Sequence, residues 1–317
     1  MNNPLRLNTW RTILFTAFAL IAFASNSVLN RLALGGNTID AGSYIGIRLL
    51  SGALTLWLIN GISKRNFSLI RTAFVGASLS RFLPAFYLFA YGVAFSFAYL
   101  SLSSGMGAFI LFGTVQTTML SMAILRGERP HISEWLGLIV AIGGLIFLVL
   151  PGLSAPDPLG ALLMILAGVS WAFYTLKGRG IKDPLETTAL NFILSVPMVL
   201  TVNALIFLHS YFYKSEGIFV TASGAWQEGV AYAFVSGALT SGVGYAIWYA
   251  ALKGLKTTQA ALLQLLVPII AAVGGIIFLS ESITSRLIVA GLLIITGIVL
   301  ALLGKRFWKF YAKNGLK

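Results

Sequence analysis

The amino-acid sequence predicts an all-α integral membrane protein with ten transmembrane helices, arranged as two inverted five-helix repeats. Three observations lead to this prediction: the composition, the length of the apolar runs, and a match between the two halves. Of the 317 residues, 58% are hydrophobic and only 10% are charged. Soluble domains have about 25% charged residues. A chain of this composition therefore has too few charged residues to form the surface of a soluble protein.

The apolar runs place the predicted spans. A bilayer core about 30 Å thick is crossed by about 20 helical residues. Ten runs have this length, at residues 12–31, 42–62, 82–101, 105–125, 134–151, 159–177, 187–208, 229–252, 258–280 and 285–304. They leave no room for a separate soluble domain. We therefore expect one transmembrane domain, in which residues 1–152 and 153–317 form the two repeats.

The first run has features of both a membrane span and a secretory signal. Arg6 and Arg11 precede it, and the Ala-Phe-Ala at residues 22–24 has the small–x–small form of a cleavage site. The apolar run nevertheless continues past this site to Leu34. We expect the segment to be retained as the first helix.

The distribution of basic residues predicts the orientation. If the N-terminus is cytoplasmic, Arg48 lies within a span and the rest of the 22 basic residues face the cytoplasm, except Arg31, Lys214 and Arg286. This bias follows the positive-inside rule and predicts that both termini are cytoplasmic. It also accounts for the net charge of +13 without a nucleic-acid partner, because no basic stripe is interleaved with aromatic residues.

The two halves share a diverged internal repeat. The segment 91–95 (YGVAF) precedes Tyr99, and the segment 241–245 (SGVGY) precedes Tyr249. In each half an apolar span then ends in a glutamate, and a glycine follows that glutamate by sixteen residues. An odd number of spans per half gives the halves opposite orientations in the membrane. Such inverted repeats are typical of secondary transporters, with the binding site near the midplane between the halves.

Several short segments match one known family. They are GERP at 127–130, EWLG at 134–137, the glycine pair at 143–144, SWAFY at 170–174, YAIWYAAL at 245–252, Arg48 in the second span and Pro268 in the ninth. With these segments the sequence resembles the drug/metabolite transporter superfamily, in its ten-helix EamA-type branch. The resemblance implies export of small metabolites through a cavity between helices one to four and six to nine, with helices five and ten peripheral. The fourth helix departs from the repeat, with Val115 and Gln116 where the ninth has Pro268.

No catalytic residue, metal ligand or cofactor is expected. The chain has no cysteine, and its two histidines, His131 and His209, are far apart in sequence. None of the nine acidic residues lies in the middle of a predicted span, which argues against paired catalytic carboxylates and against a buried proton relay. For Glu128 and Glu281 we expect helix capping, or pairing with a neighbouring arginine such as Arg286. An intramembrane enzyme is therefore not expected, and no glycine-rich phosphate loop indicates the use of ATP.

Polar side chains within the predicted spans are candidates for substrate binding. A charge inside a bilayer is costly and usually functional. Arg48 either reaches outward to the interface or holds a carbonyl or carboxylate inside the bundle. Asn26 and Asn30 share one helical face, Gln116 is central in the fourth span, and Gln264 lies in the ninth. Because a buried amide needs a partner, these side chains either join helices or contact a ligand.

Aromatic side chains with polar tips form stripes on several predicted spans. Most such stripes serve packing, yet buried tyrosine and tryptophan need hydrogen-bond partners, so these residues are also candidates for the pocket. They are Tyr91, Tyr99, Trp171, Tyr174, Tyr245 and Trp248. Three prolines interrupt spans and are candidate hinges, because each removes a backbone hydrogen bond. They are Pro84, Pro197 and Pro268.

Taken together, these features predict a multi-pass transporter of the cytoplasmic membrane. We expect it to export a small organic metabolite by alternating access, in contact with the lipid bilayer and without a nucleic-acid partner. The uncharged, aromatic lining favours neutral or zwitterionic substrates such as amino acids. A homodimer is compatible with the sequence, although one chain can enclose a site. The alternative is a membrane partner or sensor that transports nothing.

Overall fold

Every element of the described chain is a helix, as the sequence predicts. The computed structural model describes residues 9–75, 79–125, 132–150, 155–178, 181–213, 226–255, 263–264 and 266–313. In this part of the chain, seven helices are long and apolar enough to cross a membrane. Shorter apolar helices cover Trp135–Leu148, Leu266–Leu279 and Ser285–Ala301. The protein is therefore a multi-pass membrane protein. The predicted boundary between residues 152 and 153 lies outside the described residues.

The helices follow one another with short connections. In chain order they are α1 (Thr9–Gly35), α2 (Ala41–Lys64), α3 (Leu69–Phe74), α4 (Leu79–Ala98), α5 (Ser104–Leu125), α6 (Ile132–Val149), α7 (Pro158–Gly178), α8 (Pro184–Tyr213), α9 (Trp226–Val235), the π-helix η1 (Ser236–Val243), α10 (Gly244–Leu252), α12 (Leu266–Leu279) and α13 (Ser285–Lys313). Two details differ from the sequence prediction. The short helix α3 was not expected, and the apolar run 229–252 is divided by η1.

Acidic residues in the connections fix where several helices begin. The side chain of Asp40 accepts a hydrogen bond from the backbone N–H of Ser43 at 2.8 Å and so caps α2. Asp157 accepts from the N–H of Gly160 at 2.7 Å at the start of α7. These bonds satisfy backbone donors that have no partner within the helix. The acids at the span ends therefore have a structural use.

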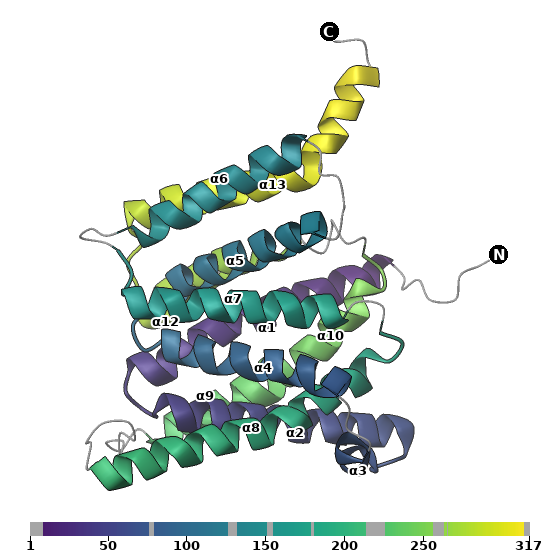
Figure 1. The fold of residues 1–317 in the computed structure, drawn as a ribbon, viewed down its shortest axis with the longest axis vertical. Coiled ribbons are helices and arrows are strands. Elements are labelled where there is room, and N and C mark those ends of the chain that lie inside the picture. The colour runs from purple at the N-terminus through teal and green to yellow at the C-terminus, as the bar shows by residue number, and fades with distance from the viewer. Residues whose placement is uncertain are drawn as a thin grey trace, which may run out of the picture.

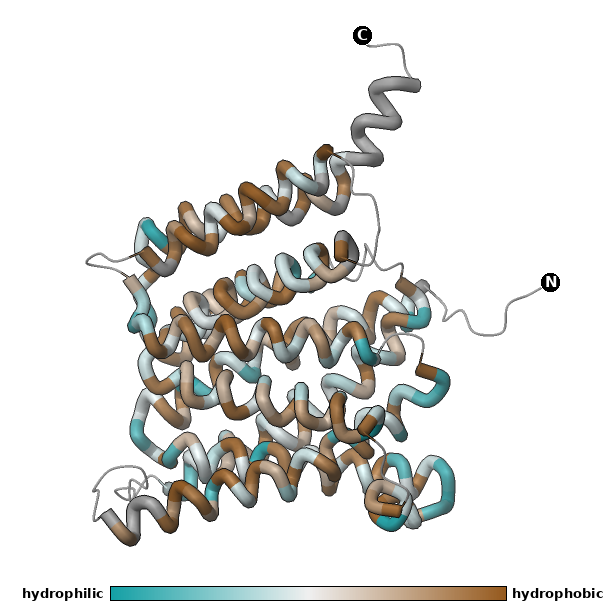
Figure 2. The backbone as a smooth tube through the Cα atoms, viewed as in Figure 1, coloured by the Kyte–Doolittle hydropathy of each residue, from teal (hydrophilic) through white to brown (hydrophobic). Residues whose placement is uncertain are grey.

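The helices form a bundle in which α6 and α13 make a separate pair at one edge (Figure 1). Elsewhere α4 packs against α7 and α8, α2 packs against α8 and η1, and α1 packs against α10, η1 and α12. Hydrophobic residues cover the helices along their lengths, and hydrophilic residues gather toward the helix ends (Figure 2). The pattern suits a bundle with lipid along its sides and water at its ends.

The α6–α13 pair depends on glycines that let the two backbones approach closely. A Cβ added at Gly137 of α6 would lie 2.7 Å from the Cβ of Ala301 of α13. A Cβ added at Gly297 of α13 would lie 2.6 Å from the carbonyl oxygen of Gly137. Small residues at such crossings are the usual basis of close helix packing in membranes.

We expect Gly137→Ala to destabilise the protein by about 1–3 kcal/mol, because the added methyl group overpacks the α6–α13 contact. The matched control is Gly143→Ala on the same helix, where an added Cβ meets nothing within 4 Å. Both changes gain the same helix propensity, so their difference reports packing alone. Thermal unfolding in detergent measures it. Equal melting temperatures for the two variants would contradict the packing role.

Candidate functional site

A buried arginine joins α2, α4 and the η1–α10 segment. Arg48 of α2 is 2% exposed. Its Nε donates to the Oγ of Ser241 in η1 at 3.1 Å. Its Nη2 donates to the hydroxyls of Tyr245 in α10 and Tyr91 in α4, at 3.4 and 3.5 Å. The guanidinium carbon also lies 5.2 Å from the ring centroid of Phe95. The side chain therefore points into the bundle and not toward the interface.

The amide of Asn26 joins α1 to the π-helix. Its Oδ1 accepts hydrogen bonds from the hydroxyls of Ser236 at 2.8 Å, Thr240 at 2.5 Å and Ser241 at 3.3 Å. A π-helix brings residues five positions apart to the same side, so Ser236 and Ser241 can both reach one acceptor. Because Ser241 also accepts from Arg48, the arginine and the asparagine belong to one polar network.

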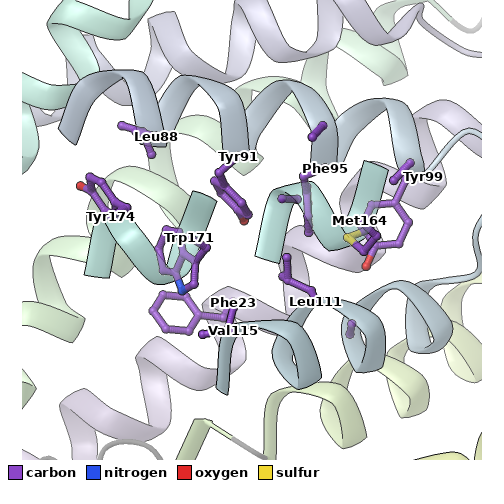
Figure 3. Packing of buried hydrophobic residues seen from close by; sticks show 14 of the residues in the cluster. Phe23, Leu88, Tyr91, Phe95, Tyr99, Leu111, Val115, Met164, Trp171 and Tyr174 are labelled. Carbon is purple, nitrogen blue, oxygen red and sulfur yellow. The ribbon is translucent and has the colours of Figure 1, made fainter. Parts of the chain in front are cut away.

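An aromatic cluster lies beside this network. The ring centroid of Trp171 in α7 is 4.8 Å from that of Tyr91, 4.9 Å from that of Tyr245 and 5.4 Å from that of Tyr174. Figure 3 shows Trp171 between Tyr91 on one side and Phe23 on the other. These rings come from α1, α4, α7 and α10, so helices far apart in the sequence meet here.

Two adjoining voids lie within the polar network and the aromatic cluster. The larger, of about 10 Å³, has room for about one water molecule and is lined by Phe23, Asn26, Ser27, Tyr91, Phe95, Leu111, Phe112, Trp171 and Tyr245. The smaller is too tight for a water molecule and is lined by Arg48, Leu49, Leu88, Tyr91, Gly92, Phe192, Ser241 and Tyr245. Tyr91 and Tyr245 line both. Neither set of lining residues, within the described chain, includes an acid.

Comparisons with known proteins identify the family. Residues 158–303 match the EamA-like transporter family. An uncharacterized protein of Pseudomonas aeruginosa is 44% identical over 292 residues, covering 92% of this chain and 94% of the relative. The threonine/homoserine exporter of Salmonella typhimurium is 26% identical, over 90% of this chain and 89% of that protein. A probable amino-acid metabolite efflux pump of Escherichia coli is 25% identical, over 74% and 81%.

This chain belongs to the EamA-like transporter family. It is therefore a member of the drug/metabolite transporter superfamily and a transporter, not an enzyme. A solved crystal structure covers 92% of this chain and 98% of its own, with a TM-score of 0.59 and 17% identity. At this identity the match shows that the transporter shares the fold of that structure.

The other predicted site residues of the transporter do not line the two voids. Asn30 donates to the backbone oxygen of Asn26 at 2.8 Å and accepts from Ser96 at 3.2 Å, so it links α1 to α4. The ring of Trp248 packs 5.6 Å from that of Phe23. Gln116 and Gln264 are 8% and 7% exposed, and neither lines the two voids.

The three prolines occupy different positions in their helices. Pro84 lies inside α4 and Pro197 inside α8. Pro268 lies in α12, and Leu263 and Gln264 shortly before it are also helical. Pro84 also lines a larger cavity of about 290 Å³, together with Arg81 and Lys177 among others. Pro84 has no backbone N–H and so donates no hydrogen bond within α4.

One end of the transporter is tied together by Glu281, and we call it the Glu281 end. The carboxylate accepts from the N–H of Ser104 at 2.9 Å and from its Oγ at 2.5 Å. It lies 3.8 Å from the Nε of Arg31, and Arg31 donates to the carbonyl oxygens of Tyr99 and Leu100 at 3.2 Å. Glu281 thus caps α5 as predicted, but the arginine it pairs with is Arg31. Glu128 lies outside the described residues.

The opposite end, which we call the Lys64 end, has its own ion pairs. The Nζ of Lys64 at the end of α2 lies 2.5 Å from Asp183, and it also bonds Glu186 at the start of α8. Partial burial of Asp183 opposes its ionisation, but the hydrogen bonds from Lys64 and from the N–H of Glu186, together with nearby lysine charges, outweigh this, and the pKa of the carboxyl lies below its ordinary value. These pairs attach α2 to α8.

Sequence reasoning missed several residues of the site. The candidates did not include Phe23, Ser236, Thr240, Phe112 and Phe192. The spacing of four between Ser236 and Thr240 puts two hydroxyls on one face of an apolar segment, which is a signal that could have indicated them. An apolar residue such as Phe23 has no distinguishing signal, because its neighbours in the first span are also apolar.

We expect Trp171→Ala to abolish transport while the protein stays folded, because Trp171 contacts rings from α1, α4 and α10 and lines the larger void. The measurement is the initial rate of substrate efflux from liposomes. Trp226→Ala is the matched control, since Trp226 is 52% exposed at the start of α9. Size-exclusion chromatography checks the fold. A wild-type rate in Trp171→Ala would contradict the assignment of the site.

Proposed function

We propose that this transporter exports a small organic metabolite, neutral or zwitterionic, such as an amino acid, across the cytoplasmic membrane by alternating access. The main support is the buried, aromatic-lined void beside Arg48 and Asn26. Tyrosine, serine and asparagine side chains there offer hydrogen bonds without a carboxylate, which suits substrates without net positive charge. The names of two relatives also support export of amino acids: a threonine/homoserine exporter and a probable amino-acid metabolite efflux pump.

The proposed architecture consists of ten spans in two inverted halves, residues 1–152 and 153–317. In this scheme α9, η1 and α10 together form one span. The contacts of Arg48 support the scheme. In the sequence repeat Tyr91 is equivalent to Ser241, and Arg48 donates to both side chains. Matched positions of the two halves therefore meet at one guanidinium, as expected near a pseudo-two-fold axis between inverted repeats.

Alternating access requires one closed and one open route to the site. With both termini in the cytoplasm, the Glu281 end faces outward, and its hydrogen bonds join α1, the α4–α5 turn and α5 to the α12–α13 turn. The cavity of about 290 Å³ beside Pro84 and Lys177 would then be the cytoplasmic vestibule. The structure corresponds to an inward-facing state in this proposal, with Pro84 as the bend that widens the vestibule.

The partners in this proposal are the substrate and the lipid bilayer. Large apolar side chains such as Ile139, Leu159 and Ile277 are each more than 60% exposed on the helices, which suits contact with lipid. One chain encloses the site, so a homodimer would be an association of complete transporters. Family membership favours transport over the alternative of a sensor that moves nothing.

An efflux assay tests the proposed function. Purified protein is reconstituted in liposomes that contain a broad metabolite extract, and mass spectrometry follows which compounds leave. We expect selective loss of one class of small metabolites from wild-type vesicles and none from vesicles with Trp171→Ala. The assay is repeated under a proton gradient and a membrane potential. No selective loss under any of these conditions, from folded protein, would contradict transport of this kind.

Single cysteines test the orientation, because the chain has no cysteine of its own. We expect Asn37→Cys, in the α1–α2 turn, to react with an impermeant maleimide added to intact cells. Arg65→Cys, at the end of α2, should react only after the cells are opened. The reverse pattern would show that the Glu281 end faces the cytoplasm.

We expect Glu281→Gln to loosen the outer closure, because the variant loses the charge that strengthens the hydrogen bonds from Ser104 and that pairs with Arg31. The measurement is the rate at which a small thiol reagent, added outside, modifies a cysteine at Ser27, which lines the larger void. An increase of about tenfold corresponds to about 1.4 kcal/mol of lost closing energy. Glu228→Gln is the control, since Glu228 is exposed on α9. Equal rates in both variants would overturn the closing role.

A further inference from the structure

The charge of Arg48 has no counter-charge among the described residues. The ion pairs between them lie at the Glu281 end and the Lys64 end, and none includes Arg48. Its three hydrogen-bond partners are hydroxyl groups, which are uncharged. An arginine remains protonated in proteins, so it cannot relieve the cost of burial by losing a proton. The site is electrostatically incomplete until an anion is present.

Two donors at this position have hydrogen atoms to offer. The Nη1 of Arg48 is buried and has no partner. The hydroxyl of Tyr91 accepts from Arg48 and from Tyr245, and its own hydrogen is left for a further acceptor. A charged N–H beside an O–H matches an oxyanion with two oxygens in one plane, and bonds of this kind are stronger than neutral ones.

The space around these donors is closed in this state. Arg48 lines the smaller void, which is too tight for a water molecule, and Trp171 lines the larger, of about 10 Å³. Tyr91 and Tyr245 line both, so a substrate reaches the arginine only when these two rings move aside. The carboxylate would then lie on the arginine, with the rest of the molecule against the aromatic rings.

We infer that the substrate carries a carboxylate and that Arg48, together with the hydroxyl of Tyr91, is its receptor. This inference rests on the proposed transport function and names the chemical group that the same site selects. Zwitterionic α-amino acids have this group and belong to the class proposed above, whereas hydroxy and oxo acids have it with a net negative charge. An amino acid would place its ammonium over the ring faces of the cluster, where a cation is attracted to aromatic side chains. A hydroxy acid would lack that contact.

Matched pairs of carboxylate and carboxamide test the inference. The probes are L-alanine, L-phenylalanine and L-lactate, each beside its carboxamide, in efflux from liposomes that contain the full-length protein. We expect wild-type protein to move at least one carboxylate about 30-fold faster than its carboxamide, the effect of one buried hydrogen bond to a charged group. The alanine and lactate arms distinguish the amino acid from the hydroxy acid.

Two variants separate recognition from a purely structural role. Arg48→Lys keeps the charge but loses the planar fork, and we expect the preference for carboxylate over carboxamide to fall about tenfold. Tyr91→Phe keeps the ring and removes the hydroxyl, with a similar fall expected. The control is Tyr87→Phe on the same helix, whose ring stacks 5.3 Å from Phe173 and should leave the preference unchanged. If Arg48→Lys does not fold, Tyr91→Phe still decides the question.

The outcomes distinguish a failure of the carboxylate receptor from a failure of the proposed transport function. Equal efflux of carboxylates and carboxamides, or release of only carboxylate-free compounds from the broad extract, would overturn the carboxylate receptor and leave transport intact. A uniform loss of rate in Arg48→Lys and Tyr91→Phe, with the preference retained, would also overturn it, since a structural role predicts that result. No efflux from either mixture would contradict the proposed function itself.

Discussion

A buried cation that lacks an opposite charge constrains the centre of this transporter. Removing a guanidinium from water costs several kcal/mol, so the surrounding helices must supply acceptors to it. Tyr91, Ser241 and Tyr245 supply them from α4, η1 and α10. The backbone of η1 must also lie close to that of α2. Gly237 of η1 permits this, because an added Cβ there would lie 2.7 Å from the backbone carbonyl carbon of Arg48. The positions of these elements around α2 therefore depend on one side chain.

The π-helix extends this constraint to the first helix. A regular α-helix turns side chains five residues apart away from each other, whereas the wider i→i+5 turn brings them together. Ser236 and Ser241 can then both donate to Asn26, while Ser241 accepts from Arg48. The irregular turn thus connects α1 and α2 through hydroxyl groups. π-turns often occur at functional sites, and this one borders the void beside Arg48 through Ser241.

The two ends of the bundle differ in what a conformational change has to break. At the Glu281 end, a carboxylate caps α5 and faces Arg31, with charge-assisted bonds that hold separate turns together. At the Lys64 end, the ion pairs involve side chains about one-third exposed or more, and such pairs contribute little stability. In the proposed cycle the exposed ion pairs at the Lys64 end can be replaced by contacts with water. Breaking the contacts at the Glu281 end costs free energy that the substrate or new contacts must offset.

The sequence by itself determined the all-α membrane class, because a bilayer accepts only long apolar helices or closed barrels. It also indicated Asn26, Arg48, Tyr91, Trp171 and Tyr245, since polar tips in apolar spans need partners. It did not determine which residues are those hydrogen-bond partners. Spacing along one helix defines a face but not the helix opposite, because in a bundle rich in small residues many pairings are sterically allowed.

Only the tertiary structure decided which candidates meet. It brought five of them to two shared voids, placed Gln116 and Gln264 elsewhere in the interior, and added Phe23 from an otherwise uniform apolar run. It also gave Glu281 a partner 250 residues away in Arg31, where sequence proximity suggested Arg286. The physical reason is the same in each case: buried polar groups pair with whatever the packed helices bring within hydrogen-bond distance, and that distance is set by contacts between segments remote in the chain.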